Sequence, residues 1–215
     1  ENFPQEVEAA VSVCKYMAFG PLYNGSVRFK DYAVMADSLF FQTLGIEVLR
    51  GDPLHELQQK DVVFLSDRLA QKMFGDEDPV GKVINYDKQL QLTVKGIYAA
   101  LPENSTMNPE AVISIVSAWS RDWAEYSWEG GDSFFQYIRF RPGVKVDVEK
   151  FNARLETVIH NYLPQDGKDN SSYTSIVKPL RDVYRSGDMV KRMNAITLIL
   201  GLAILFIAAM NYVLI

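Results

Sequence analysis

The sequence has a single cysteine, no initiator methionine and no basic run of the kind that binds nucleic acid. Because Cys14 stands alone, no disulfide can form within the chain, and its strand-like surroundings predict a buried structural thiol. The formal net charge of −5 also argues against nucleic-acid partners, which require clustered lysine and arginine. The chain opens at Glu1 without the sections of a signal peptide, so we expect a fragment or a processed chain.

Motifs of catalysis and of metal or nucleotide binding are also missing. Between Gly75 and Lys82 the glycines are one residue too far apart for a phosphate-binding loop, and Val83 replaces the required Ser or Thr. His55 and His160 have no second ligand at metal-binding spacing, so we expect both on the solvated surface. No Gly-x-Ser-x-Gly elbow is present. We therefore predict no catalytic, cofactor-binding or metal site, no cofactor, and a protein that is not an enzyme.

A long apolar run occupies the C-terminal end. Residues 195–215 carry no charge and, as a helix, would extend roughly 31 Å, which matches the hydrocarbon core of a bilayer. The alternative is a buried helix of a soluble core, but such helices are usually shorter and keep one polar face. We therefore predict a transmembrane helix over residues 193–215.

The orientation of this helix is left open by its flanking charges. The positive-inside tendency, taken alone, would place the preceding basic residues in the cytoplasm, whereas long polar domains cross a membrane largely regardless of their charge. These basic residues are Arg181, Arg185, Lys191 and Arg192.

Strand and helix patterns alternate through the polar part, without a glycine-rich nucleotide turn, and predict an α+β domain of two lobes. Asp147 opens an amphipathic helix that ends at Pro164. Residues 181–191 are expected to be a linker. Further strands are predicted at 46–49, 62–65, 82–86, 90–98, 111–116, 134–140 and 173–180, with short helices at 37–45 and 66–75.

Two surface features have competing interpretations. Arg50-Gly51-Asp52 is the tripeptide of integrin ligands, but a turn before Pro53 explains it more simply. The aromatic stretch 119–135 either anchors a core or lines a groove for a sugar, a peptide or another partner. Trp119 and Trp123, four residues apart, would share one helical face under the first interpretation. The stretch comprises Trp119, Trp123, Tyr126, Trp128, Phe134 and Phe135.

Several separate blocks occur in the order found in a known family. Together they resemble the MacB-like periplasmic core domain of ABC-transporter permeases of the FtsX-like class, over most of residues 30–110 and the C-terminus. The blocks are Ala36-Asp37-Ser38-Leu39-Phe40-Phe41-Gln42-Thr43-Leu44-Gly45, Val62-Val63-Phe64-Leu65-Ser66-Asp67-Arg68-Leu69-Ala70-Gln71-Lys72-Met73-Phe74-Gly75, Asp78-Pro79-Val80-Gly81-Lys82, Val94-Lys95-Gly96-Ile97 and Asn211-Tyr212.

The resemblance implies an extracytoplasmic domain between the first and second of four transmembrane helices. Residues 36–110 would form an inserted α/β lobe, and residues 1–35 with 111–190 a discontinuous porter-like lobe. The protein would lie in the bacterial cytoplasmic (inner) membrane, with residues 1–190 on the periplasmic or extracytoplasmic side. The family's shared residues are folding determinants rather than ligands.

The implied function is mechanical. A separate cytoplasmic ABC ATPase subunit would hydrolyse ATP, and a permease homodimer or heterodimer would transmit the resulting motion outward, for export or for signalling. The alternative is a membrane-anchored ligand-binding or sensing module that uses the aromatic stretch. A membrane-bound hydrolase, the third class, would need a nucleophile and a base that the sequence does not supply.

Overall fold

The computed structural model describes residues 2–14, 20–30, 32–102, 104–105, 107–123, 134–162 and 176–213. The chain forms two compact units. The first comprises residues 1–146 and 160–165, and the second comprises residues 147–159 and 166–215.

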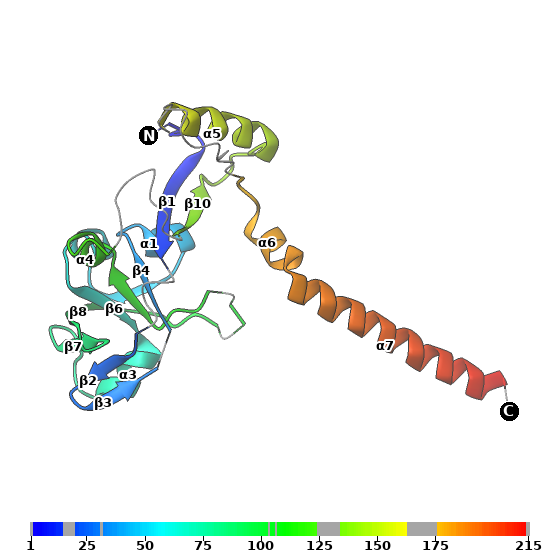
Figure 1. The fold of residues 1–215 in the computed structure, drawn as a ribbon, viewed down its shortest axis with the longest axis horizontal. Coiled ribbons are helices and arrows are strands. Elements are labelled where there is room, and N and C mark those ends of the chain that lie inside the picture. The colour runs from blue at the N-terminus through cyan, green and yellow to red at the C-terminus, as the bar shows by residue number, and fades with distance from the viewer. Residues whose placement is uncertain are drawn as a thin grey trace. The chain divides into compact units, whose positions relative to one another are not determined.

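The first unit is built on one mixed sheet, which has ten strands within the described residues (Figure 1). Its order is β10-β1-β4-β9-β6-β8-β7-β2-β3, and β5 pairs with β8. The strands are β1 Val7–Cys14, β2 Leu22–Asn24, β3 Val27–Phe29, β4 Ala33–Ala36, β5 Val48–Arg50, β6 Val62–Ser66, β7 Val83–Tyr86, β8 Leu90–Tyr98, β9 Ala111–Ser114 and β10 Phe134–Phe140.

The centre of the sheet joins distant parts of the chain. β4 pairs in parallel with β9, so that Ala33 lies opposite Ala111. β6 pairs antiparallel with β9 and parallel with β8. Strands from residues 36–110 and from the flanking segments are thus neighbours in one sheet, and the division into an inserted and a porter-like lobe stays a prediction.

Both faces of the sheet carry apolar cores, which explains why the central strands β4, β6 and β9 are buried at every position and almost continuously apolar. Along β6, Val63 and Leu65 belong to one buried cluster, and Val62 and Phe64 belong to the other. Cys14 lies in the first cluster and is buried, as predicted. The α+β class is therefore confirmed.

One helix covers each core, and both follow their sequence signals. α3 (Asp67–Phe74) begins after Ser66, whose Oγ accepts a hydrogen bond from the Leu69 N–H at 2.9 Å, and buries Leu69 and Met73 in the first cluster. α1 (Phe40–Leu44) buries Phe40 and Phe41 in the second.

α1 ends where a left-handed residue is needed. Gly45 has a φ of 69°, a conformation that glycine adopts without steric cost. The short helix predicted at 37–45 is thus confirmed, although the helix proper begins at Phe40. Two further short helices are α2 (Pro53–Glu56) and α4 (Val116–Trp119).

The second unit is helical where it is described. It contains α5 (Val148–Tyr162) up to Ile159, α6 (Leu180–Ser186) and α7 (Asp188–Val213) (Figure 1). Asp147 Oδ1 accepts a hydrogen bond from the Lys150 N–H at 3.2 Å, which confirms the predicted start of α5. Pro164, its predicted end, lies outside the described residues.

Three predicted boundaries are wrong. Residues 176–179 have no regular structure and α6 begins at Leu180, so this part of the strand expected at 173–180 is absent; residues 173–175 lie outside the described residues. Pro179 lacks the N–H that a strand ladder requires. The expected linker 181–191 contains α6 and the start of α7. β9 stops at Ser114, because Val116 already belongs to α4.

Candidate functional site: an exposed apolar helix

The most prominent surface feature of the described residues is α7. Its segment Val190–Tyr212 is long and apolar enough to cross a membrane: at 1.5 Å per residue its 23 residues extend about 35 Å. Every side chain from residue 191 to residue 212 is exposed. A soluble core helix would be largely buried, whereas continuous exposed apolar surface of this extent is typical of membrane or partner contact. Residues 214–215 of the predicted 193–215 span lie outside the described residues.

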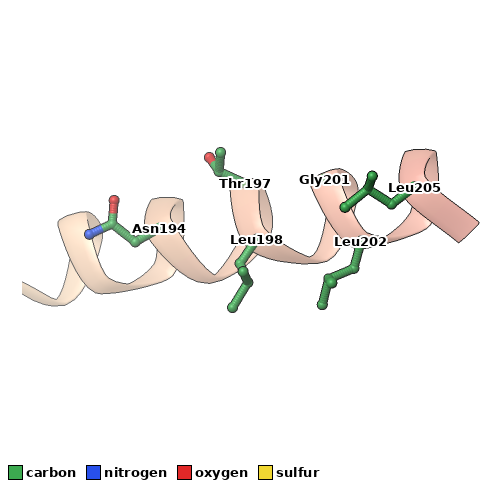
Figure 2. A pocket seen from close by; sticks show the side chains of 6 residues that line it. All are labelled: Asn194, Thr197, Leu198, Gly201, Leu202 and Leu205. Carbon is green, nitrogen blue, oxygen red and sulfur yellow. The ribbon is translucent and has the colours of Figure 1, made fainter.

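One side of α7 is shallowly hollowed (Figure 2). Gly201 leaves a gap in the side-chain surface, and Thr197 Oγ1 donates a hydrogen bond to the Met193 carbonyl at 2.9 Å, which satisfies a hydroxyl that lipid cannot. All residues that line the hollow belong to α7, so it is a helix face rather than a ligand cavity. They are Asn194, Thr197, Leu198, Gly201, Leu202 and Leu205.

The aromatic stretch divides between core and surface. Trp119 and Phe134 pack partly buried against the cluster that contains Cys14 and Leu65. Trp123 is 37% exposed, and Phe135 is 39% exposed. α4 ends at Trp119, so the predicted common helical face of Trp119 and Trp123 is wrong. Tyr126 and Trp128 lie outside the described residues.

Arg121 fixes the surroundings of Trp123. Its guanidinium carbon lies 5.8 Å from the centroid of the Trp123 ring, in cation–π range. The same guanidinium lies 2.8 Å from the carboxylate of Asp61 and donates a hydrogen bond to the Ser117 carbonyl at 3.0 Å. The Arg121 guanidinium therefore contacts part of the exposed Trp123 ring, which limits the area left for a ligand.

The acidic turn between Gly75 and Lys82 is closed by internal ion pairs. Arg50 binds both carboxylate oxygens of Asp78, at 2.8 and 2.9 Å, and holds the pKa of that carboxyl below its usual value. Lys82 pairs with Glu77 and lowers the pKa of its carboxyl. These carboxylates would repel a phosphate, and the two cations are already neutralised.

Residues of the Arg50-Gly51-Asp52 tripeptide likewise make contacts within the domain. Arg50 is bound to Asp78, while the carboxylate of Asp52 accepts a hydrogen bond from the Leu54 N–H at 3.1 Å and caps α2. The contacts of Arg50 and Asp52 are therefore internal to the domain, which favours the structural interpretation of the tripeptide over adhesion.

Ser66 and Glu110 form a buried polar contact that the sequence did not reveal. The Ser66 hydroxyl donates to one oxygen of Glu110, and Arg68 donates to the other oxygen. Ser66 is fully buried, and its oxygen also caps α3. A nucleophile must reach its substrate, so this hydroxyl serves packing rather than hydrolysis. Residues 44 positions apart give no sequence signal for such a pair.

Burial raises the pKa of several tyrosines and of Asp37 in the first unit. It raises the pKa of Tyr98 well above its usual value, and the Tyr98 hydroxyl donates to the Pro109 carbonyl at 2.6 Å. Burial raises the pKa of Tyr32 to about 12. Burial likewise raises the pKa of Asp37, although this carboxylate accepts hydrogen bonds from the Ser12 and Leu39 N–H groups.

Metal ligands are not gathered anywhere in the described part of the chain: no three His, Cys, Asp or Glu side chains lie close enough to share an ion. His55 is exposed, with its Nδ1 2.5 Å from a carboxylate oxygen of Asp52, and His160 is exposed on α5. Both histidines are therefore where the sequence predicted them.

The chain resembles solved domains of transport-related proteins in its fold. A domain of a proposed permease protein from Porphyromonas gingivalis superposes with a TM-score of 0.61 at 22% identity, covering 85% of this chain and 84% of that one. The periplasmic region of MacB from Actinobacillus actinomycetemcomitans gives 0.55 at 15% identity, covering 72% and 69%. The extracellular domain of the noncanonic ABC-type transporter YknZ from Gram-positive bacteria gives 0.54 at 14%, covering 75% and 81%. At these identities the likeness establishes the fold.

The family is identified from the sequence. No curated protein matches the chain in the sequence search. The family model of the MacB-like periplasmic core domain, however, matches residues 1–158, well over half of the chain. On this match, and with the fold to support it, the chain belongs to the family of MacB-like periplasmic core domains.

Proposed function

We propose that this extracytoplasmic permease domain couples ATP hydrolysis by a separate cytoplasmic ABC ATPase to motion outside the membrane. The observation that carries the proposal is that the family domain, matched over residues 1–158, and the exposed apolar helix α7 belong to one chain. A domain tied directly to a membrane-spanning helix can receive mechanical work without binding nucleotide itself.

The chemistry of the first unit agrees with a mechanical role. Polar side chains of this unit bind one another: Ser66 binds Glu110, Arg50 binds Asp78, and Arg121 binds Asp61. Such contacts stiffen a domain. We infer that the chain is not an enzyme and that the nucleotide binds to the partner ATPase.

The face of α7 shown in Figure 2 supports packing against further membrane helices. A small residue such as Gly201 lets two helix backbones approach closely, and Asn194 offers an amide for a hydrogen bond across the contact. We propose that these partners are the other membrane helices of a permease homodimer or heterodimer.

The location follows from the same reasoning. With α7 in the bacterial inner membrane, the proposed position of residues 1–190 is the periplasmic or extracytoplasmic side. The basic residues before α7 oppose this orientation under the positive-inside tendency, but a long folded domain crosses largely regardless of its charge.

Purification of the full-length subunit from its native membrane tests the coupling. We expect an ABC ATPase to co-purify in detergent, and ATP with vanadate to change the rate at which a protease cleaves the subunit. A partner ATPase with its nucleotide-binding lysine replaced should bind but cause no such change. A subunit that purifies without any ATPase, and whose cleavage ignores nucleotide, would contradict the proposal.

The output, export or mechanical signalling, needs a separate measurement. In proteoliposomes that contain the subunit and its ATPase, export predicts ATP-dependent movement of a cargo peptide or lipoprotein across the bilayer. Signalling predicts the nucleotide-dependent cleavage change with no cargo movement.

A membrane-anchored binding or sensing module remains the second candidate, favoured by the exposure of Trp123 and Phe135. Titration of the protein with a panel of oligosaccharides and short peptides, followed by tryptophan fluorescence, would detect such a ligand. The double variant Trp123→Ala with Phe135→Ala should abolish the response and leave the fold intact, because Trp119 and Phe134 keep their core contacts. An unchanged response in this variant would count against a ligand at these rings.

A further inference from the structure

Positive charge is concentrated immediately before the apolar span and at its first residues. Residues 176–192 contain five basic and two acidic residues, a net charge of +3, whereas the whole chain has a net charge of −5. The rest of the chain therefore carries −8. Because basic residues on the outer side of a membrane oppose the positive-inside tendency, their gathering at this place calls for a physical reason.

These basic side chains are available to a partner. Lys178, Arg181, Lys191 and Arg192 are all exposed. The Nε of Arg181 lies 3.5 Å from a carboxylate oxygen of Asp182, but an ion pair this exposed is weak and leaves most of the positive potential in place.

Apolar side chains accompany the charges. Ile176 is 60% exposed, Leu180 is 58% exposed and Val183 is 50% exposed. Leu180 and Val183 are three residues apart on α6, so they share a face of that helix. Exposed apolar groups beside lysine and arginine are typical of segments that lie in the interface of a membrane.

The position along the chain identifies the partner as lipid. The span begins at Val190, so Lys191 and Arg192 stand within about 3 Å of its start, and their long side chains reach the phosphates at the edge of the hydrocarbon core. Phosphates of anionic lipids attract basic residues at a membrane surface. A soluble acidic protein would match the charges but not the apolar groups next to the bilayer.

We propose that residues 176–192 form a membrane-surface element that binds the headgroups of anionic phospholipids in the leaflet facing the folded domain. Lys178, Arg181, Lys191 and Arg192 contact the phosphates, while Ile176, Leu180 and Val183 enter the acyl boundary. The proposal rests on the proposed function in one respect, namely that α7 spans a bilayer.

Amide hydrogen exchange in nanodiscs tests it. The protein is placed in discs of phosphatidylcholine alone and in discs with about three parts phosphatidylcholine to one part phosphatidylglycerol. We expect peptides from 176–192 to exchange at least about fivefold more slowly in the anionic discs, the effect of a single basic residue at such a surface. High salt should remove the difference, because it screens exposed charges.

A charge variant and a matched control complete the test. The quadruple variant Lys178→Gln, Arg181→Gln, Lys191→Gln and Arg192→Gln should abolish the difference between the lipids. The control variant Arg28→Gln, Lys30→Gln, Lys60→Gln and Lys145→Gln, which changes four exposed basic residues of the first unit, should retain it. Equal exchange in the two lipids, or loss of the difference in the control variant, would overturn the proposal.

Membrane insertion of α7 is measured on the same samples by alkaline extraction. If α7 inserts and the lipids make no difference, only this inference fails. If α7 does not insert, the proposed function fails and the inference falls with it.

Discussion

Ser66 and Glu110 connect the start of α3 to the segment before β9. The Ser66 side chain meets two needs at once, since its oxygen caps α3 and its proton goes to Glu110. Polar side chains with two buried partners cost more to remove than surface groups, because each partner is left unsatisfied.

Ser66→Ala should therefore lower the free energy of unfolding by about 2 kcal/mol, from the lost cap of α3 and the lost hydrogen bond to one Glu110 oxygen, while Arg68 still holds the other oxygen. Urea titration in detergent, followed by circular dichroism, measures the change. Thr157→Ala is the matched control, because the Thr157 hydroxyl is exposed on α5 and donates to the Ala153 carbonyl within its own helix. A loss of similar size in the control would show that the assay reports hydroxyl removal in general.

Asp37 should give the first unit an unusual pH response. Burial raises its pKa, so the folded chain holds this proton more tightly than the unfolded chain, and its contribution to stability rises as the pH falls through the raised pKa towards the ordinary value of 3.8. Since Asn cannot take up the proton, the wild type should gain stability relative to Asp37→Asn between pH 7 and that value. Urea midpoints measured across this range check the trend.

Asp78→Asn should show the opposite dependence of stability on pH. Arg50 lowers the pKa of Asp78, so the contribution of this carboxylate is present above 3.8 and is lost as the pH falls through the lower folded value. The wild type should then lose stability relative to Asp78→Asn in that acidic window. If the stability difference from the wild type changed with pH in the same direction for Asp37→Asn and Asp78→Asn, the opposite pKa shifts assigned to the two carboxyls would be contradicted.

At the scale of elements, local signals predicted most of the secondary structure. The buried run of β6, the Ser66 cap of α3, Gly45 after α1 and Asp147 before α5 all have short-range causes. One local signal went unused: Gly25-Ser26, with Gly25 at a φ of 56°, is the two-residue turn of the β2–β3 hairpin.

Apart from the strand expected at 173–180, where Pro179 is a local cause, the errors lie where distant contacts or side-chain packing decide the structure. Trp123 is partly exposed because the chain turns after α4. The four-residue spacing of Trp119 and Trp123 does not predict that turn. The pairing of β4 with β9 and the contact of Ser66 with Glu110 depend on the whole sheet. Of the candidate site, the sequence alone predicted the apolar helix, while the exposure of the residues around α6 required the structure.

The membrane assignment of α7 makes a direct prediction for its centre. Leu202 lies near the middle of Val190–Tyr212, where an arginine is about 3 kcal/mol less favourable than an apolar residue. Leu202→Arg should reduce the inserted fraction of α7, measured with glycosylation acceptor sites on either side of the helix. Leu202→Val, which keeps the segment apolar, should insert normally. Insertion unaffected by the arginine would be inconsistent with a spanning helix.

At the scale of the molecule, a lone buried thiol makes topology easy to measure. Cys14 is the only cysteine and is buried, so the parent protein should resist a thiol reagent. Val83→Cys adds an exposed thiol to the first unit, since Val83 is 53% exposed.

In cells with a permeabilised outer membrane and an intact inner membrane, we expect an impermeant maleimide to label the Val83→Cys variant and not the parent. Labelling that requires rupture of the inner membrane would place the first unit in the cytoplasm and would reverse the proposed orientation.

The parallel pairing of β4 with β9 also constrains how the domain is made. Ala33 can pair only after Ala111, 78 positions later, has been synthesised, and the middle of the sheet cannot form before then. Until then the apolar edge of β4 is open to incorrect pairing, as long-range strand pairings form slowly. Biosynthesis of this domain should thus depend on a holding chaperone on the side where it folds, and a cell short of such chaperones should lose the protein to aggregation during synthesis.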